Sequence, residues 1–185
     1  MADRALRILD FDIENRPLAY WFDGRTTCEI TAIASCWMHQ PDTMEFTLLG
    51  VHEPVYMLES FRRRYDEADI VTGHYIREHD LPTINGAMLE HGLPPLAAKL
   101  TVDTRLDLTA RKDLSASLEE LGVMFGLEAR KQHMSNSEWR EANRLKRSGI
   151  AKAQERATSD VLLHMEVYRK LVEGRYLGRP KVWRP

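Results

Sequence analysis

The sequence predicts one α/β domain in which helices cover a mixed sheet of five strands. Two observations predict this fold class. Near the N-terminus, three segments rich in branched and aromatic residues follow one another across short turns, as in an antiparallel meander. Farther along, strand-like and helix-like segments alternate, which is typical of parallel strands joined by helices. The expected strands are residues 4–13, 29–38, 44–51, 69–73 and 100–104.

Turn sequences mark the boundaries of the first three strands. The sequence FDGR at residues 22–25 precedes the second strand, and QPD at residues 40–42 precedes the third. Glycine, proline and aspartate favour tight turns because they adopt or stabilise backbone angles that other residues resist. The fourth strand, DIVTG, is short and mostly apolar, as strands buried inside a sheet are.

Helical spacing begins after the third strand. Apolar residues fall on one side of residues 54–67, and residues 81–90 carry Pro82 in the first turn, where proline is tolerated. After the fifth strand the chain is expected to be helical to near its end. Ser135 opens a capping box, and the last helix is expected over residues 150–173.

The chain has 185 residues, of which 43% are hydrophobic, which is the size of one domain with a buried core. Residues 1–185 are expected to form that domain, with a basic tail at residues 174–185. Apolar runs fall far short of the roughly 20 residues that a membrane helix needs. Acidic residues stand where a signal peptide needs an apolar run, so a cytoplasmic location is expected. Cys28 and Cys36 lack the spacing of a zinc site or a disulfide framework.

The net charge of −2 conceals an asymmetry along the chain. Residues 1–129 hold 12 basic and 22 acidic residues, whereas residues 130–156 hold 8 basic and 3 acidic ones. Residues 169–185 hold 6 basic and 1 acidic residue. A basic C-terminal third beside an acidic body suits a phosphate-rich partner. The alternative is that these basic residues form the solvated face of a helix.

Three acids alternate along the first strand. Because side chains alternate across a strand, Asp10, Asp12 and Glu14 project to one face, and the apolar residues between them project to the other. Neighbouring carboxylates on a half-buried face repel one another unless a cation neutralises them. The strand therefore predicts a bound cation, unless this end of it is an exposed edge.

Two further acids stand at positions where burial is expected. Asp80 opens a helix, where the peptide dipole favours an anion, although an ordinary N-cap is the alternative. Asp160 lies at the margin of an apolar stripe on the last helix, and an arginine partner is the alternative there. The stripe consists of Ile150, Ala153, Ala157, Val161, His164, Tyr168 and Leu171.

Separate acidic sites that each need a cation are best explained by one shared metal site. Hard carboxylate ligands with few histidines favour Mg²⁺ or Mn²⁺ over zinc. Two such ions about 4 Å apart, held by four carboxylates, form a known apparatus for hydrolysing phosphodiesters.

This pattern resembles the DEDD superfamily of 3′–5′ exonucleases, which have a ribonuclease-H-like fold. Its Asp-x-Glu motif matches LDFDIEN at Asp12 and Glu14, and its second motif matches IVTGHYIREHDLP at Asp80. The third matches SDVLLHMEVY at Asp160, so the resemblance covers about residues 5–172. It implies that these four acids hold two Mg²⁺ or Mn²⁺ ions and that nucleoside 5′-monophosphates are released.

The sequence departs from the family at three places. Tyr75 stands where members usually carry asparagine, and His79 stands where many carry phenylalanine. Members also carry a histidine five residues, or a tyrosine four residues, before the last aspartate, where this chain has Glu155 and Arg156. Glu155 is the first candidate for a substitute general base, and His79 and His133 are the others. Loss of the base leaves either a slower enzyme, since such help contributes about 10²–10⁴-fold, or an inactive one.

Two other acids are expected to support the site or the fold. Asp10 shares a face with Asp12 and Glu14 but precedes the motif, so a structural or supporting role is expected. Asp103 stands where relatives often carry an Asp-Thr pair and is interpreted as structural.

The resemblance implies that the substrate is the 3′ end of single-stranded DNA or RNA, with DNA favoured. Aromatic side chains that follow Glu14, namely Tyr20, Trp21 or Phe22, could stack on bases, or they could cover the core. His74 and Tyr75 lie near Asp80 in the motif and are further substrate-binding candidates. The expected contacts to the phosphate backbone are Lys131, Arg140, Arg144, Lys146 and Arg147.

A binding module is the competing hypothesis. Such a protein would keep the fold without hydrolysis and bind single-stranded nucleic acid or a replication or repair partner, such as a polymerase. The missing histidine or tyrosine favours this alternative. The complete set of four carboxylates argues against it, because a retired site has no reason to keep acids that repel one another.

Overall fold

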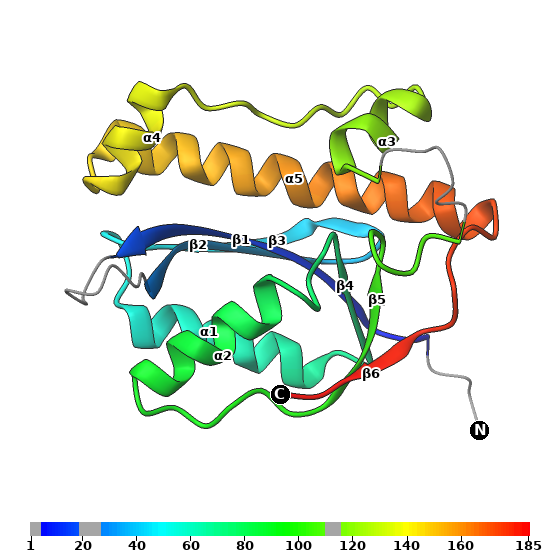
Figure 1. Cartoon of the computed structure of the whole chain (residues 1–185), viewed down its shortest axis with the longest axis horizontal. Helices are drawn as coiled ribbons and strands as arrows, with labels where there is room; N and C mark the ends of the chain where they lie inside the picture. Colours follow the sequence, from blue (N-terminus) through cyan, green and yellow to red (C-terminus); the bar gives the residue numbers. More distant parts are fainter. Residues whose placement is uncertain (1–4, 19–26, 110–115) are drawn as a thin grey trace.

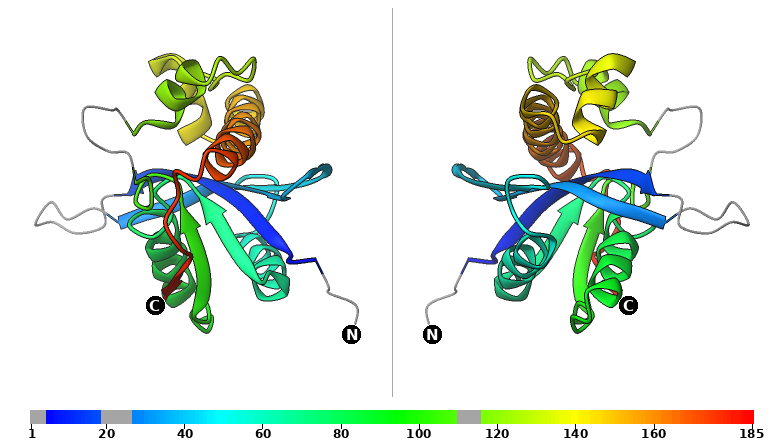
Figure 2. Two further views of the ribbon diagram at one scale, coloured as in Figure 1. Left: turned by 90° about the vertical axis from the view of Figure 1, so that its right-hand side faces the viewer. Right: turned by 90° about the vertical axis from the view of Figure 1, so that its left-hand side faces the viewer.

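The computed structural model describes residues 5–18, 27–109 and 116–185 and has three layers (Figure 1). The middle layer is a sheet, α5 covers one face of it, and α1 and α2 cover the other. Figure 2 looks along the molecule from its two ends and shows α3 and α4 packed beside α5, on the side away from the sheet. The helices are α1 (Pro54–Glu67), α2 (Asp80–Glu90), α3 (Leu118–Met124), α4 (Asn136–Asn143) and α5 (Arg147–Glu173).

Within the described part of the chain the sheet has six strands in the order β3-β2-β1-β4-β5-β6. The pairs β1–β2, β2–β3 and β5–β6 are antiparallel, whereas β1–β4 and β4–β5 are parallel. The predicted mixed sheet with flanking helices is therefore confirmed. The strands are β1 (Ile8–Leu18), β2 (Thr27–Trp37), β3 (Gln40–Leu48), β4 (Ile70–Gly73), β5 (Lys99–Asp103) and β6 (Lys181–Trp183).

The sixth strand lies in the segment that the sequence predicts only as a basic tail. It has three residues, and two of them are exposed, so it carries no strand periodicity that could be recognised. The Thr101 hydroxyl donates a hydrogen bond to the Lys181 carbonyl at 2.9 Å, and Trp183 packs into the core with 8% of its surface exposed. Contacts with β5 therefore make this segment a strand.

Alternation along β1 divides its side chains as predicted. Leu9, Phe11 and Ile13 pack into the core on the side of α1 and α2, where the Phe11 ring lies 4.8 Å from that of Phe61. The three acids of β1 project to the opposite face, toward α5. This strand is central in the sheet, so the alternative of an exposed edge does not hold.

The long helix α5 places the predicted stripe against the sheet. It begins at Arg147, three residues before the expected start, and ends at Glu173 as expected. Ala157 and Val161 of the stripe pack against Ala32 and Ala34 of β2, and these small side chains allow the helix to lie close to the sheet. None of the described helices is both long enough and apolar enough to span a membrane.

Candidate metal centre

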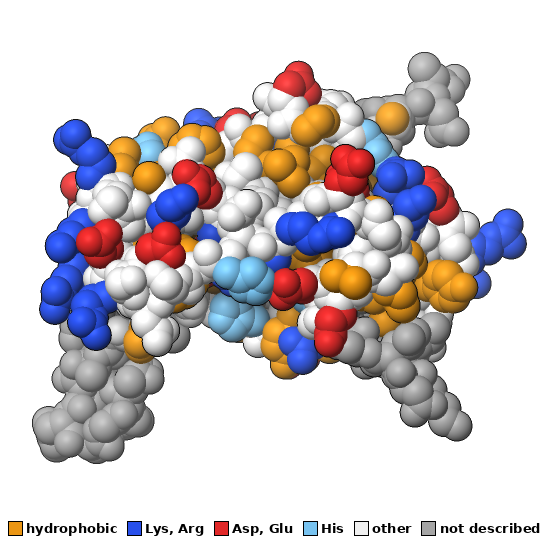
Figure 3. Space-filling view, turned by 90° about the horizontal axis from the view of Figure 1, so that it is seen from above, with side chains coloured by type: hydrophobic (Ala, Val, Ile, Leu, Met, Phe, Trp, Pro, Cys, Tyr) orange, Lys and Arg blue, Asp and Glu red, His pale blue; other side chains and the backbone are white. Residues whose placement is uncertain are grey.

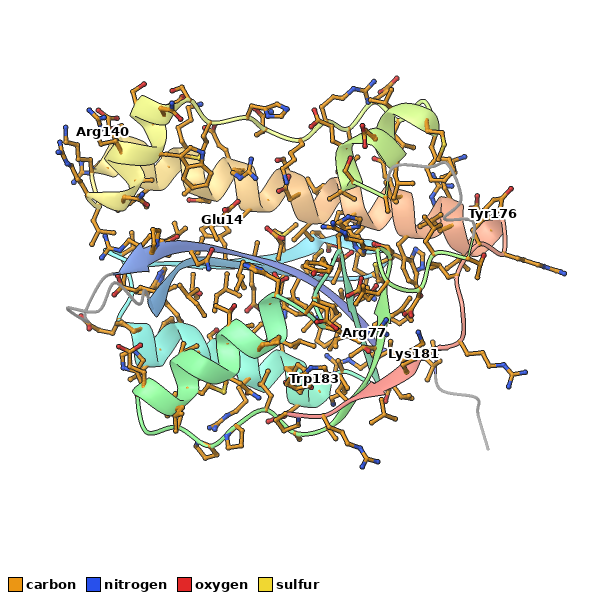
Figure 4. The ribbon with its side chains drawn as sticks, viewed as in Figure 1. Glu14, Arg77, Arg140, Tyr176, Lys181 and Trp183 are labelled. Atoms are coloured by element: carbon orange, nitrogen blue, oxygen red, sulfur yellow. The ribbon has the colours of Figure 1, made fainter. Side chains whose placement is uncertain are left out.

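Three carboxylates from opposite ends of the chain meet between β1 and α5. Asp12 and Glu14 come from β1 and Asp160 comes from α5, and one oxygen of each lies within 4.8 Å of the other two. Figure 4 shows Glu14 between this strand and this helix. Asp160 is 3% exposed, and the Glu14 side chain is 12% exposed. Side chains on one face recur every two residues along the strand and every three to four residues along the helix. These repeats place the acids on the two faces that pack against each other.

The fourth predicted acid, Asp80, lies beside this group at the first residue of α2. Its Oδ1 accepts a hydrogen bond from the Ile13 backbone N–H at 3.2 Å, and its Oδ2 lies 3.4 Å from His79 Nδ1. It is 3% exposed and close enough to repel the ionised form of Asp12. Asp80 therefore borders the three-carboxylate group and is tied to β1 by the backbone.

Burial, with repulsion from neighbouring acids, disfavours the ionised forms of Asp12 and Glu14. Burial raises the pKa of Asp12 well above its usual value, and the charges of Asp80, Asp160 and Glu14 raise it further. Burial also raises the pKa of Glu14, against the opposing effect of Arg156. A bound cation would favour the ionised forms of Asp12 and Glu14.

Two basic side chains contact the carboxylates directly. Lys131 Nζ lies 2.8 Å from Asp160 Oδ2, and Arg156 Nε lies 2.5 Å from Glu14 Oε1. Arg156 Nη2 also lies 3.7 Å from Asp160 Oδ2. From the sequence, Lys131 is expected to contact the nucleic-acid backbone, whereas in the structure it contacts Asp160. An arginine is the alternative partner expected for Asp160, and Arg156 lies near it. Arg156 was a recognisable candidate, because residues four apart share a helix face.

The donor set fits a hard divalent cation. Three carboxylate oxygens converge within a space that one ion spans, and carboxylates are the ligands that Mg²⁺ and Mn²⁺ prefer. Asp160 Oδ1 is buried and has no hydrogen-bond partner among the described residues. A buried carboxylate oxygen without a donor is costly, so a cation at this position would satisfy it.

The three candidates for a general base lie in different surroundings. Glu155 is on the outward side of α5, where its half-exposed carboxylate pairs with Lys152 Nζ at 2.7 Å. His133 is exposed and pairs with Glu119 at 2.8 Å. Of the three, His79 is the one that contacts a predicted metal ligand, and the hydrogen bond to Asp80 raises its pKa.

The predicted substrate contact His74 belongs to a chain of buried polar groups. Its Nδ1 lies 3.0 Å from Thr104 Oγ1, which lies 2.9 Å from His164 Nε2. His164 Nδ1 in turn lies 2.6 Å from Asp10 Oδ2. Burial lowers the pKa of His74 to about 3, so its ring is neutral at physiological pH. Asp10 is therefore paired with His164 in the interior, which agrees with the structural alternative expected for it.

Tyr75 has a left-handed backbone, with φ of 74°. Asparagine, which stands here in the exonucleases that the sequence resembles, tolerates this conformation better than tyrosine does. Here the Tyr75 N–H donates to Asp103 Oδ1 at 3.0 Å, and the Arg105 guanidinium lies 4.4 Å from the centre of the tyrosine ring. Asp103 also accepts hydrogen bonds from the N–H groups of Arg77, Arg105 and Leu106, which agrees with a structural role.

The basic residues other than Lys131 lie at the end of the molecule where α4 joins α5. Arg140, Arg144, Lys146 and Arg147 are exposed, and Figure 3 shows Lys and Arg side chains gathered at this end, on its left. Figure 4 shows Arg140 beyond Glu14, toward the end of the molecule where α4 joins α5. The candidate stacking residues Tyr20, Trp21 and Phe22 lie outside the described residues.

Among solved structures, the chain is similar to the family B DNA polymerase from the hyperthermophilic archaeon Pyrobaculum calidifontis. The match has a TM-score of 0.65 and 15% sequence identity, and it covers 91% of this chain and 25% of the polymerase. The chain thus corresponds to a quarter of that polymerase's length, and the likeness shows a shared fold. The sheet and its flanking helices are compatible with the ribonuclease-H-like fold. No protein-family model and no curated protein matches the sequence.

Proposed function

We propose that this protein is a metal-dependent 3′–5′ exonuclease that acts on single-stranded nucleic acid, with DNA favoured over RNA. It would hydrolyse phosphodiester bonds from the 3′ end and release nucleoside 5′-monophosphates. The observation that carries this proposal is the meeting of Asp12, Glu14 and Asp160 within 4.8 Å. The family motifs that the same residues match, and the fold shared with a DNA polymerase, support it.

Each group in the site has a separate task in this proposal. Asp12, Glu14 and Asp160, bordered by Asp80, would hold Mg²⁺ or Mn²⁺, two ions by the family resemblance. Bound cations of this kind activate water and stabilise the charge that develops on the phosphate. His79, whose Nδ1 lies 3.4 Å from Asp80 Oδ2, would be the candidate general base. The basic residues at the junction of α4 and α5 would attract the phosphate backbone.

A strand labelled at its 5′ end tests the activity and its direction. Incubation with Mn²⁺ or Mg²⁺ is expected to give a ladder of shorter products that keep the label, and EDTA is expected to abolish it. Release of the label as a mononucleotide would indicate the opposite direction. Cleavage of a circular single strand would indicate an endonuclease.

Two variants of α5 control for contaminating nucleases. Asp160→Asn removes a proposed ligand and is expected to abolish the ladder. Glu173→Gln changes an exposed acid of the same helix that pairs with Arg169, and it is expected to leave the ladder unchanged. Equal activity of both variants would contradict the proposal.

The contacts of Lys131 and Arg156 favour one alternative, a module that binds nucleic acid without cutting it. In that case the two basic side chains would permanently neutralise the carboxylates. The protein would then bind a fluorescent single strand, or a replication or repair partner such as a polymerase, and no shortening would occur with either metal. Fluorescence anisotropy and the cleavage assay, carried out on the same preparation, separate the two functions.

A further inference from the structure

Lys131 and Arg156 are fixed parts of the candidate centre. Besides its contacts with the carboxylates, Arg156 Nη1 donates to the Gln132 carbonyl at 2.8 Å, and its guanidinium lies 5.3 Å from the centre of the Trp139 ring. Its side chain is 16% exposed, and that of Lys131 is 26% exposed. Charges that are partly removed from water interact more strongly than loose surface charges do.

The segment between α3 and α4 carries Lys131 to the site. It passes along α5, where the Gln132 N–H donates to Ser159 Oγ at 3.1 Å. The Arg156 guanidinium donates to the carbonyl of the same glutamine. The lysine is thus held over Asp160 by two backbone contacts next to it, and α5 supplies both of them.

The net charge of the site is balanced by one divalent cation. With the ring of His79 beside Asp80 counted as neutral, Asp12, Glu14, Asp80 and Asp160 carry four negative charges when ionised, and Lys131 and Arg156 carry two positive ones. One divalent ion brings the group to neutrality, whereas a second would create an excess of positive charge in a partly buried place, which is unfavourable. Protonation of His79 would add a third positive charge and disfavour a second ion further.

The geometry indicates the same number of ions. Asp12, Glu14 and Asp160 alone converge within 4.8 Å among the described residues. Asp80 is already engaged by the Ile13 N–H and by His79. The oxygen Asp160 Oδ1 is buried and has no hydrogen-bond partner among the described residues, so it can accept a cation.

We propose that, in the absence of nucleic acid, the centre binds one divalent cation, while Lys131 and Arg156 supply the positive charge that a second ion would otherwise bring. This inference rests on the proposed function, because it assigns the ligands to the same metal site. It differs from the family resemblance, which implies two ions.

Isothermal titration of the metal-free full-length chain with MnCl₂ tests the number of ions directly. We expect one ion per chain for the wild type. Lys131→Met is expected to bind that ion at least about tenfold more tightly, because a positive charge next to Asp160 is removed. Lys131→Met combined with Arg156→Met is expected to bind two.

Matched variants keep the test independent of folding. Lys152→Met removes an exposed lysine that pairs with Glu155 on the same helix, and it is expected to bind one ion with the affinity of the wild type. Arg156→Lys keeps the charge and is expected to keep the stoichiometry of one. Circular dichroism and thermal melting establish that each variant is folded before titration.

The outcomes separate this inference from the proposed function. Two ions on the wild type would overturn the inference and leave the nuclease proposal standing. No binding by the wild type, under conditions where it is folded, would overturn both. An affinity of Lys131→Met equal to that of the wild type would also overturn the inference, because the lysine would then have no electrostatic effect on the site.

Discussion

Two groups of acids in the described part of the chain, one around Asp12 and one around Asp107, have opposite surroundings. On β5 and the loop after it, Asp107 accepts hydrogen bonds from two Arg77 nitrogens, at 2.9 Å and 2.6 Å, and from Lys181 at 2.8 Å. The backbone N–H of Asp103 donates to it as well, at 3.0 Å. Figure 4 shows Arg77 and Lys181 together near β6, at a distance from Glu14.

The two groups therefore differ in charge state. Burial acts to raise the pKa of Asp107, but its hydrogen bonds with Arg77 and Lys181 prevail and lower it. The pKa values of Asp12 and Glu14 are raised, since burial and neighbouring acids outweigh their basic contacts. An acid whose oxygens accept hydrogen bonds from several donors stabilises the fold. Acids that face one another repel, and a bound cation is needed to neutralise them. This difference distinguishes a structural cluster from a candidate site.

The largest expected effect is the loss of activity in Asp12→Asn. Removal of a proposed ligand is expected to lower the cleavage rate by at least about 10³-fold, because metal stabilisation of the transition state amounts to several kcal/mol. In metal-free buffer the same variant is expected to melt at the wild-type temperature or slightly above it, because repulsion is relieved. Marked unfolding would show that Asp12 is structural, as Asp107 is.

The matching change in the structural cluster is Asp107→Ala. It leaves Arg77 without its buried partner, and we expect the free energy of unfolding to fall by roughly 3 kcal/mol. Urea denaturation measures this change, with Glu173→Ala, at an exposed acid, as the control. A loss below about 1 kcal/mol would mean that the cluster contributes no more than a surface ion pair.

A third prediction concerns pH and metal together. Because the folded-state pKa of Asp12 is raised, its contribution to stability is present at low pH and is lost as the pH rises through that pKa. A divalent cation binds the ionised form. Added Mn²⁺ is therefore expected to raise the melting temperature by several degrees at a pH above the raised pKa of Asp12 and by much less at a pH below it, and melting curves recorded across the pH range measure this difference. An equal rise at both pH values, or the same pH dependence in Asp12→Asn, would contradict this reading.

The smallest expected effect is that of Glu155→Gln. Because Glu155 pairs with Lys152 on the outward side of α5, we expect the cleavage rate to stay within about threefold of the wild type. General-base catalysis contributes about 10²–10⁴-fold to the rate. A hundredfold fall in the cleavage rate would therefore show that Glu155 acts as the general base. His79→Asn is the comparison variant, because His79 contacts Asp80.

Local periodicity accounts for the part of the site that the sequence predicts. Alternation along β1 places Asp12 and Glu14 on one face, and the apolar stripe of α5 turns Asp160 toward the sheet. Both rules depend on residues close together in the chain, so no tertiary information is needed. The mixed sheet follows in the same way from short turns and from the alternation of strands with helices.

Long-range packing decided the rest. Lys131 reaches Asp160 because its segment binds Ser159, and His164 pairs with Asp10 across the domain. The strand β6 exists because β5 offers it an edge. The sequence by itself determined which acids face α5, through the repeat of strand and helix. Only the tertiary structure decided which basic side chains contact those acids. Such contacts join distant segments, depend on how whole elements pack, and produce no periodic pattern in the sequence.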